Sequence, residues 1–300
     1  MNKESSMYVT AAIGNLIARD FPVIDYKKAD LDKAKSEFSE EEIEELSELG
    51  LMKGDFEEYY VIREFCRRIS LGDVAEGDYI AEIFKNFMKL DATEIENDAY
   101  MKLCVPEAEI GNVKLKYAQY EKGEIFQYDM PEFCKRLVVP KLGFFTKQIR
   151  FPSIYEGDMP WVSVCPSEIN SMKADIEKAE GNVLVLGLGL GYYTYMTARK
   201  ENVKKVTVVE INEKIADIFC KHILPLMECK DKIQIVLSDA IEYTNQIKDG
   251  EYDFVYADIW EGAVDGAKPY KAIKSNENRL KNTHFAYWIE PQIKAYLEDK

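Results

Sequence analysis

The sequence is poor in the residues that build metal centres. Its 300 residues include only two histidines, His222 and His284, and six cysteines that form no CxxC pair. Structural zinc sites take four Cys and His ligands at short, regular spacings, so we expect no metal site. Scattered cysteines are typical of buried thiols in a reducing compartment, which predicts a cytoplasmic protein.

Long apolar runs are also lacking. The longest, from Val183 to Met196, is shorter than the roughly 20 residues that a membrane-spanning helix needs. The N-terminal stretch MNKESSMYVTAAIGNLIARD mixes Glu4 and Asn15 into an apolar pattern. This mixture indicates an amphipathic helix rather than a secretory signal, and we expect no membrane partner.

Positive charge is scarce relative to negative charge, and the net charge is −15. Residues 166–300 contribute −4 of it, with 18 Lys and Arg against 22 Asp and Glu, so residues 1–165 contribute −11. An acidic surface repels the phosphate backbone of nucleic acids. Nucleic acid is therefore not an expected partner, whereas a small-molecule substrate is.

Composition divides the chain into three segments. Residues 1–105 carry helical patterns, and Ser39 followed by Glu42 forms a capping box that predicts a helix start. Residues 106–165 alternate polar with aromatic and β-branched side chains, punctuated by Gly and Pro. That alternation predicts a small antiparallel β unit. Residues 166–300 form the third segment.

The third segment alternates short apolar strands with helical stretches. We expect four strands, at Val183–Leu186, Val206–Val209, Ile233–Leu237 and Phe254–Ala257. This order predicts a Rossmann-like, doubly wound, mostly parallel sheet. Only forty residues follow Trp260, so the sheet is either truncated after the fourth strand or completed by the N-terminal part. One weak candidate for another strand, THFAYWI, could equally be helical.

Three glycines, Gly187, Gly189 and Gly191, follow the first strand. At this position a glycine row lets the backbone approach a ligand closely, although it can also serve helix–sheet packing alone. The dinucleotide motif GxGxxG would need glycine where Tyr192 stands, and a phosphate-binding P-loop would need a lysine before Lys200. The row fits neither motif well.

An acid closes each of the next three strands: Glu210, Asp239 and Asp258. A carboxylate such as Glu210 can accept hydrogen bonds from both ribose hydroxyls, and Asp239 can accept one from an adenine amino group. Together the acids would repel a pyrophosphate and suit a nucleoside that carries a sulfonium. S-adenosylmethionine is therefore the expected cofactor and NAD a lesser alternative, and each acid by itself could instead cap a helix.

From Gly181 to Trp260 the sequence resembles the class I S-adenosylmethionine-dependent methyltransferases. The aminopropyltransferases, such as spermidine synthase, share that core and resemble the chain more closely. The stretch VKKVTVVEINEKIADI is similar to their second strand and helix, and they too carry a β-rich segment ahead of the core. A homodimer through that β segment is the expectation that the resemblance gives.

The resemblance also implies roles for individual residues. The glycines would lie under the methionine moiety, Glu210 would hold the ribose, and Asp258 would stand beside the sulfonium and the acceptor. The complete expected cofactor site consists of Gly187, Gly189, Gly191, Tyr192, Glu210, Ile211, Asp239 and Ala240.

The sequence departs from both families at named positions. Most methyltransferases carry an acid two residues before the first glycine, where this chain has Val185. Aminopropyltransferases typically have an acid within the glycine turn, which here contains GLGLGYY. Their fourth-strand signature has two aspartates three apart before a proline, and the matching positions hold Asp258, Glu261 and Gly262.

Three functions remain open at this point. A methyltransferase acting on an unidentified small molecule leads, with Asp258 as the catalytic residue that orients or deprotonates the acceptor. An aminopropyltransferase is the alternative, in which Glu261 would bind the distal ammonium of a cationic amine. A protein that binds S-adenosylmethionine without turnover is the third.

Overall fold

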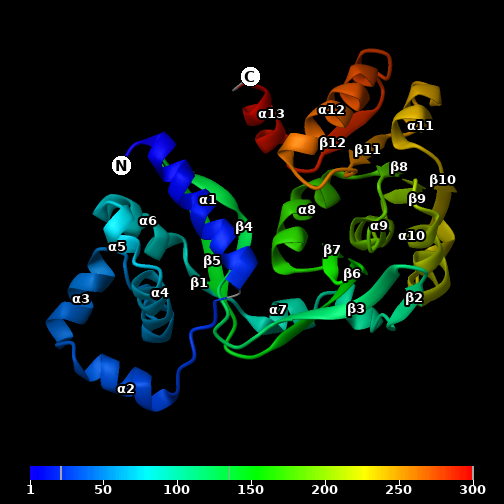
Figure 1. Ribbon diagram of the computed structural model, residues 1–300. Coiled ribbons are helices and arrows are strands. Elements are labelled where there is room, and N and C mark those ends of the chain that lie inside the picture. Colours follow the sequence, from blue (N-terminus) through cyan, green and yellow to red (C-terminus); the bar gives the residue numbers. More distant parts are fainter. Residues whose placement is uncertain (21, 135, 299–300) are drawn as a thin grey trace. The chain divides into compact units, whose positions relative to one another are not determined.

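The computed structural model describes residues 1–20, 22–134 and 136–298. Contacts divide the chain into two compact units (Figure 1). The first consists of Met1–Ile95 and Gln119–Arg150, and the second of Glu96–Ala118 and Phe151–Lys300. Among the described residues, no helix combines the length and the apolar character that crossing a bilayer requires.

The first unit packs helices onto a small sheet. Its helices are α1 (Lys3–Asp20), α2 (Lys28–Ser36), α3 (Glu40–Glu48), α4 (Phe56–Arg68), α5 (Leu71–Val74) and α6 (Gly77–Asn86), and α7 (Ala92–Glu96) follows at its boundary. Its sheet has the order β1 (Met88–Lys89), β5 (Leu137–Phe144) and β4 (Phe126–Cys134). Helix α1 lies along β5 (Figure 1), and both contribute to one buried apolar core. The predicted capping box is confirmed at α3, where Ser39 Oγ accepts from Glu42 N at 3.1 Å.

The second unit is built on a five-stranded parallel sheet. Its order is β10 (Ile233–Leu237), β9 (Val203–Glu210), β8 (Gly181–Leu186), β11 (Phe254–Ala257) and β12 (His284–Tyr287). Central strand β8 is buried from Val183 to Leu186, as expected where helices cover both faces of a parallel sheet. The expected parallel α/β sheet is therefore confirmed.

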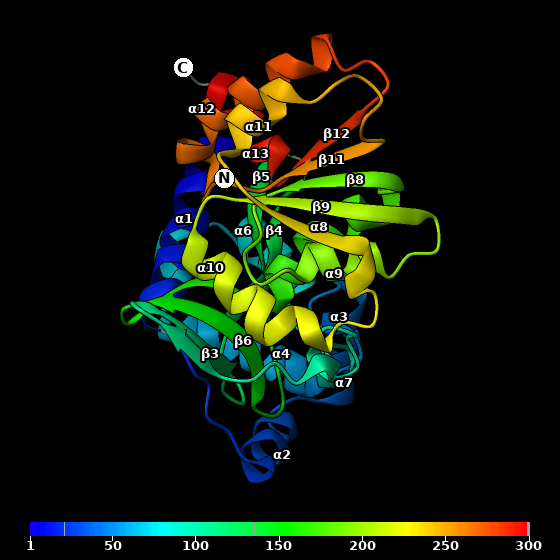
Figure 2. The same cartoon turned by 90° about the vertical axis from the view of Figure 1, so that its right-hand side faces the viewer.

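Helices flank this sheet on both sides (Figure 2). One face carries α8 (Pro166–Lys178), α9 (Tyr192–Ala198) and α10 (Glu213–Ile218). The other face carries α11 (Ala240–Gln246), α12 (Ala263–Lys274) and α13 (Glu290–Glu298). This two-sided arrangement follows from right-handed crossovers that run outward from β8 in both directions.

The sheet extends one strand beyond the four expected. The ambiguous stretch THFAYWI contains β12, and Phe254 to Ala257 of β11 pair in parallel register with His284 to Tyr287. A four-residue segment gains this conformation from its neighbouring strand more than from its own propensity. No antiparallel strand joins this sheet within the described part of the chain.

The β-rich segment 106–165 does not form one unit, which differs from the expected boundaries. Strands β4 and β5 pair with each other and pack against α1 in the first unit. A separate sheet in the order β2 (Ala108–Ile110), β3 (Val113–Tyr120), β6 (Ile149–Glu156) and β7 (Met159–Ser163) belongs mainly to the second unit. Alternation along a strand predicts its faces but not its partner, so composition could not divide this segment correctly.

Candidate functional site

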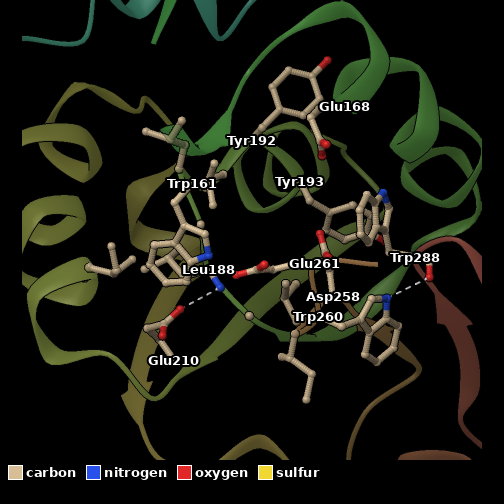
Figure 3. Close-up of a pocket in the computed structure, with 18 of the residues that line it drawn as sticks. Trp161, Glu168, Leu188, Tyr192, Tyr193, Glu210, Asp258, Trp260, Glu261 and Trp288 are labelled. Carbon is tan, nitrogen blue, oxygen red and sulfur yellow. Dashed lines mark hydrogen bonds between the residues drawn. The ribbon is translucent and has the colours of Figure 1, made fainter. Parts of the chain in front are cut away.

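A cavity of about 800 Å³ opens at the carboxyl ends of the parallel strands (Figure 3). The strand order reverses between β8 and β11, and ligands of open α/β sheets bind at such a switch point. All nine candidate residues from the sequence line this one cavity: Gly187, Gly189, Gly191, Tyr192, Glu210, Ile211, Asp239, Ala240 and Asp258. The topology therefore brings together side chains that are spread over 72 positions of the chain.

The glycine turn is shaped by protein contacts as well as by its place on the cavity. Gly187 and Gly191 have φ values of 95° and 76°, in the region that favours glycine. A Cβ on Gly187 would lie 2.0 Å from the Asp258 carbonyl oxygen, and one on Gly191 would lie 2.2 Å from the Phe219 ring. At these two positions internal packing alone requires glycine.

Glu210 joins the turn after β8 to the loop after β9. Its carboxylate accepts hydrogen bonds from Leu188 N at 3.1 Å (Figure 3) and from Asn212 N at 2.7 Å. The side chain is only 8% exposed. Each carboxylate oxygen can accept more than one hydrogen bond, so these two backbone contacts orient Glu210 and leave capacity for ligand hydroxyls.

Asp239 caps the N-terminus of α11 with only one of its two carboxylate oxygens. Its Oδ1 accepts from Ile241 N at 2.8 Å and from Glu242 N at 2.9 Å at the start of α11. Its Oδ2 has no hydrogen-bond partner within the described residues. The capping interpretation therefore holds for one carboxylate oxygen, and the other can still meet a ligand.

Tyr192 lines the cavity with its ring, because its hydroxyl is already hydrogen-bonded. The hydroxyl donates to Asp98 Oδ2 at 3.0 Å, and the ring packs against Tyr100 at a centroid distance of 5.7 Å. Burial and the charge of Asp98 raise the pKa of Tyr192 far above its ordinary value. Ile211 is 68% exposed at the cavity, so both residues can serve only as apolar walls.

Two unpartnered carboxyl groups share the interior of the cavity. Asp258 follows β11, Glu168 lies in the first turn of α8, and both point into the cavity from these separate elements (Figure 3). Neither side chain has a hydrogen bond or an ion pair with a described residue. Burial raises the pKa of Glu168 to about 7. Burial, reinforced by the charge of Glu168, raises the pKa of Asp258 well above its ordinary value.

The cavity lining is strongly acidic. Six carboxyl-bearing residues face it, namely Glu168, Glu210, Asp239, Asp258, Glu261 and Asp265, and no Lys, Arg or His among the described residues lines it. Carboxylates held in a partly desolvated site favour a cationic ligand. A ligand that carries its own carboxylate would find no basic side chain to pair with it here.

The sequence patterns did not predict several residues of the lining. Glu168 lies in the first turn of α8, and nothing in the local sequence indicates that this turn reaches the cavity. Trp161, which is 42% exposed, comes from β7, a strand outside the Rossmann-like core. Trp260 and Trp288 close another wall, and the Trp260 indole N–H donates to the Trp288 carbonyl at 3.2 Å.

The order of the strands and the position of the cavity define a Rossmann-like α/β domain with its ligand site at the switch point. Residues 167–272 of this domain match the family model of the spermine/spermidine synthase domain. The match runs from α8 through most of α12, and so contains the glycine turn and the acids at the strand ends.

Two curated proteins that are similar to part of this chain are polyamine aminopropyltransferases. The chain is 32% identical over 126 residues to a polyamine aminopropyltransferase of Clostridium botulinum (strain Eklund 17B / Type B), covering 38% of this chain and 43% of that protein. It is 32% identical over 80 residues to the polyamine aminopropyltransferase of Clostridium beijerinckii, covering 26% and 28%. The matched part thus spans less than half the length of either relative.

Two solved structures are similar to part of this chain. The spermidine synthase of Thermotoga maritima has 18% sequence identity and a TM-score of 0.29, covering 42% of this chain and 49% of that one. A conserved hypothetical protein of Streptococcus pyogenes has 17% identity and a TM-score of 0.28, covering 34% and 62%.

These matches correct the leading expectation from the sequence. A methyltransferase was wrong as the first choice, and so was S-adenosylmethionine as its cofactor, because the matched domain and relatives are those of aminopropyl transfer. Both classes act on a donor that contains an adenosine and a sulfonium. The roles expected of the glycine turn and Glu210 concern only those shared parts, so these residues do not distinguish the two classes.

Proposed function

We propose that this protein is a transferase that moves an aminopropyl group from decarboxylated S-adenosylmethionine to a cationic amine. The observation that carries the proposal is the cavity with six acidic residues and no basic side chain in its described lining. The decarboxylated donor has a sulfonium and a terminal ammonium but no carboxylate, so every charge on it is complementary to this lining. The match to the spermine/spermidine synthase domain supports the same assignment.

In this proposal the nucleoside lies across the glycine turn. Glu210 accepts from the ribose hydroxyls and the spare Oδ2 of Asp239 accepts from the adenine amino group. Gly187, Gly189 and Gly191 let the backbone approach the donor, and Tyr192, Ile211 and Ala240 supply apolar walls. The donor is consumed as a substrate.

The chemical step is a displacement at carbon. The neutral nitrogen of the acceptor attacks the propyl carbon next to sulfur, the C–S bond breaks, and methylthioadenosine leaves with the bonding pair. The attacking nitrogen then releases a proton to Asp258, whose raised pKa makes it a better base than an exposed aspartate. Glu261 binds the second ammonium of a diamine acceptor, and alignment by these charges supplies most of the catalysis.

The test is turnover with defined substrates. Decarboxylated S-adenosylmethionine and 1,4-diaminobutane are incubated with the protein, and methylthioadenosine and the elongated amine are measured by mass spectrometry. Asp258→Asn should lower the rate by about 10²- to 10⁴-fold. Asp231→Asn, at an exposed residue before β10, should leave it unchanged. Absence of methylthioadenosine with the wild-type protein would refute the proposal.

Two further expectations from the sequence are carried forward as proposals. Homodimer formation should appear as a molar mass of twice 34.6 kDa in light scattering. A cytoplasmic location should appear in cell fractionation.

A further inference from the structure

The inner part of the cavity contains three polar groups that no described residue satisfies. Two are the carboxyl groups of Glu168 and Asp258. The third is the hydroxyl of Tyr256, which is buried, has no hydrogen-bond partner in the described structure and belongs to a side chain only 1% exposed that also lines the cavity. Buried polar groups without partners are rare in folded proteins and call for an explanation.

The three groups act on one another electrostatically. Burial is the main cause of the raised pKa of Asp258, and the charge of Glu168 adds to it. Burial is also the main cause of the raised pKa of Tyr256, and the charges of Asp258 and Glu168 add to it. No cationic side chain offsets them among the described cavity residues. Each carboxyl is partly desolvated without a compensating charge from the protein, which is unfavourable for its ionised form.

Rigid, largely apolar walls hold the groups in place. Tyr193 stacks on Tyr256 with ring centroids 3.7 Å apart and an interplanar angle of 5°. Met172 and Trp288 are each only 9% exposed and line the same cavity. The Trp288 indole N–H is satisfied by Ser171 Oγ at 2.9 Å, so it does not supply a donor to the carboxyl groups.

The chemistry of a primary ammonium matches these groups. An –NH₃⁺ group has three N–H donors and no acceptor. Two carboxyl groups and a hydroxyl oxygen supply three acceptors, and the carboxylates supply the opposite charge. A neutral hydroxyl or a methyl group would leave the carboxylates without a compensating charge.

We propose that Glu168, Asp258 and Tyr256 form a subsite for a primary ammonium group, and that Glu168 makes this subsite selective for a cationic end group. The inference rests on the proposed aminopropyl transfer and adds a residue, Glu168, from outside the glycine turn and the strand ends. The glycine turn itself brings no acid, because the two residues between its glycines, Leu188 and Leu190, are apolar. The ammonium belongs either to the aminopropyl arm of the donor or to the attacking end of the diamine before that end becomes neutral, since Glu261 is assigned to the other end.

The experiment measures binding calorimetrically with matched ligands. Decarboxylated S-adenosylmethionine is compared with methylthioadenosine, which lacks the aminopropyl arm, and 1,4-diaminobutane with butane-1,4-diol, which carries no amine. Glu168→Gln keeps the shape of the side chain and removes its charge. In one of the two pairs it should weaken binding of the ligand that carries the ammonium by about ten- to a hundredfold. Methylthioadenosine affinity should stay within about twofold. Glu177→Gln, at an exposed position on the same helix, should change nothing.

The pair that responds identifies the source of the ammonium. A loss confined to the decarboxylated donor assigns the subsite to the aminopropyl arm, and a loss confined to the diamine assigns it to the acceptor. Glu168→Asp, which keeps the charge, should retain part of the affinity that Glu168→Gln loses.

Three results would overturn the inference. Unchanged affinities in Glu168→Gln would refute it while leaving aminopropyl transfer in place. An equal loss for methylthioadenosine would show that Glu168 only supports the fold of the site. A wild-type protein that binds neither nucleoside would refute the proposed function itself, and the subsite with it.

Discussion

Glu168 should make the protein less stable as the pH rises. Burial raises the pKa of its carboxyl from 4.5 to about 7. Below pH 4.5 the carboxyl is protonated in both the folded and unfolded states and costs nothing. Above pH 7 it is ionised in both states, but only the folded state bears the desolvation. Each pKa unit corresponds to about 1.4 kcal/mol, so the full cost approaches about 3 kcal/mol.

Glu168→Gln removes this ionisation while keeping the shape of the side chain. The variant should therefore exceed the wild type in free energy of unfolding by about 1 kcal/mol at pH 5 and by about 3 kcal/mol at pH 8. Urea titrations followed by tryptophan fluorescence measure both values. All three tryptophans, Trp161, Trp260 and Trp288, belong to the unit that contains Glu168, so the signal reports the relevant unfolding.

The exposed Glu177 on the same helix provides the control. Glu177→Gln should change stability by no more than about 0.5 kcal/mol at either pH. The reasoning fails if the advantage of Glu168→Gln is the same at pH 5 and pH 8, because the effect would then come from packing. It also fails if Glu168→Gln has a lower free energy of unfolding than the wild type at pH 8.

Three more predictions concern the same unit. Glu210→Ala should weaken calorimetric binding of methylthioadenosine by about ten- to a hundredfold; unchanged affinity would exclude a ribose contact. Gly191→Ala and Gly250→Ala share a positive φ, at 76° and 75°, but the added Cβ lies 2.2 Å from a ring in the first and 4.0 Å from its nearest neighbour in the second. In urea unfolding the first should therefore lose about 1–3 kcal/mol more than the second, and equal losses would contradict the packing argument. Lys200 Nζ donates to three carbonyls at the end of α8 at 2.6–2.7 Å. Lys200→Met should therefore lower the free energy of unfolding by about 1.5–3 kcal/mol, whereas Lys205→Met, at an exposed position, should lower it little. Equal losses in the two variants would argue against a stabilising role of Lys200 at the end of α8.

Local sequence patterns were sufficient to predict the parallel sheet and its ligand edge. Apolar runs separated by helical stretches can be connected in few ways, since right-handed crossovers bring every carboxyl end to one edge. Each of Glu210, Asp239 and Asp258 stands directly at the end of its strand or in the turn that follows it, so their meeting at one cavity follows from the order of the elements. The capping box at Ser39 is likewise a short-range signal.

Other features depended on contacts between distant segments. His284 to Tyr287 become a strand only beside β11, and β4 and β5 join the helical unit only through their packing on α1. The alternation of apolar and polar residues along a strand does not indicate which strand or helix it will pack against. The motifs also did not decide between methyl and aminopropyl transfer, because the roles expected of them concern an adenosine and a sulfonium, which both chemistries share.

The sequence by itself determined the four expected strands of the parallel sheet and the acids that end or follow them, because those depend on neighbours along the chain. Only the tertiary structure placed Glu168 of α8 in one cavity with Asp258 and Tyr256, and showed that no basic side chain among the described residues lines that cavity. The physical reason is that the charge and solvation of a cavity depend on every helix and strand around it, including those that lie outside the glycine turn and the strand ends.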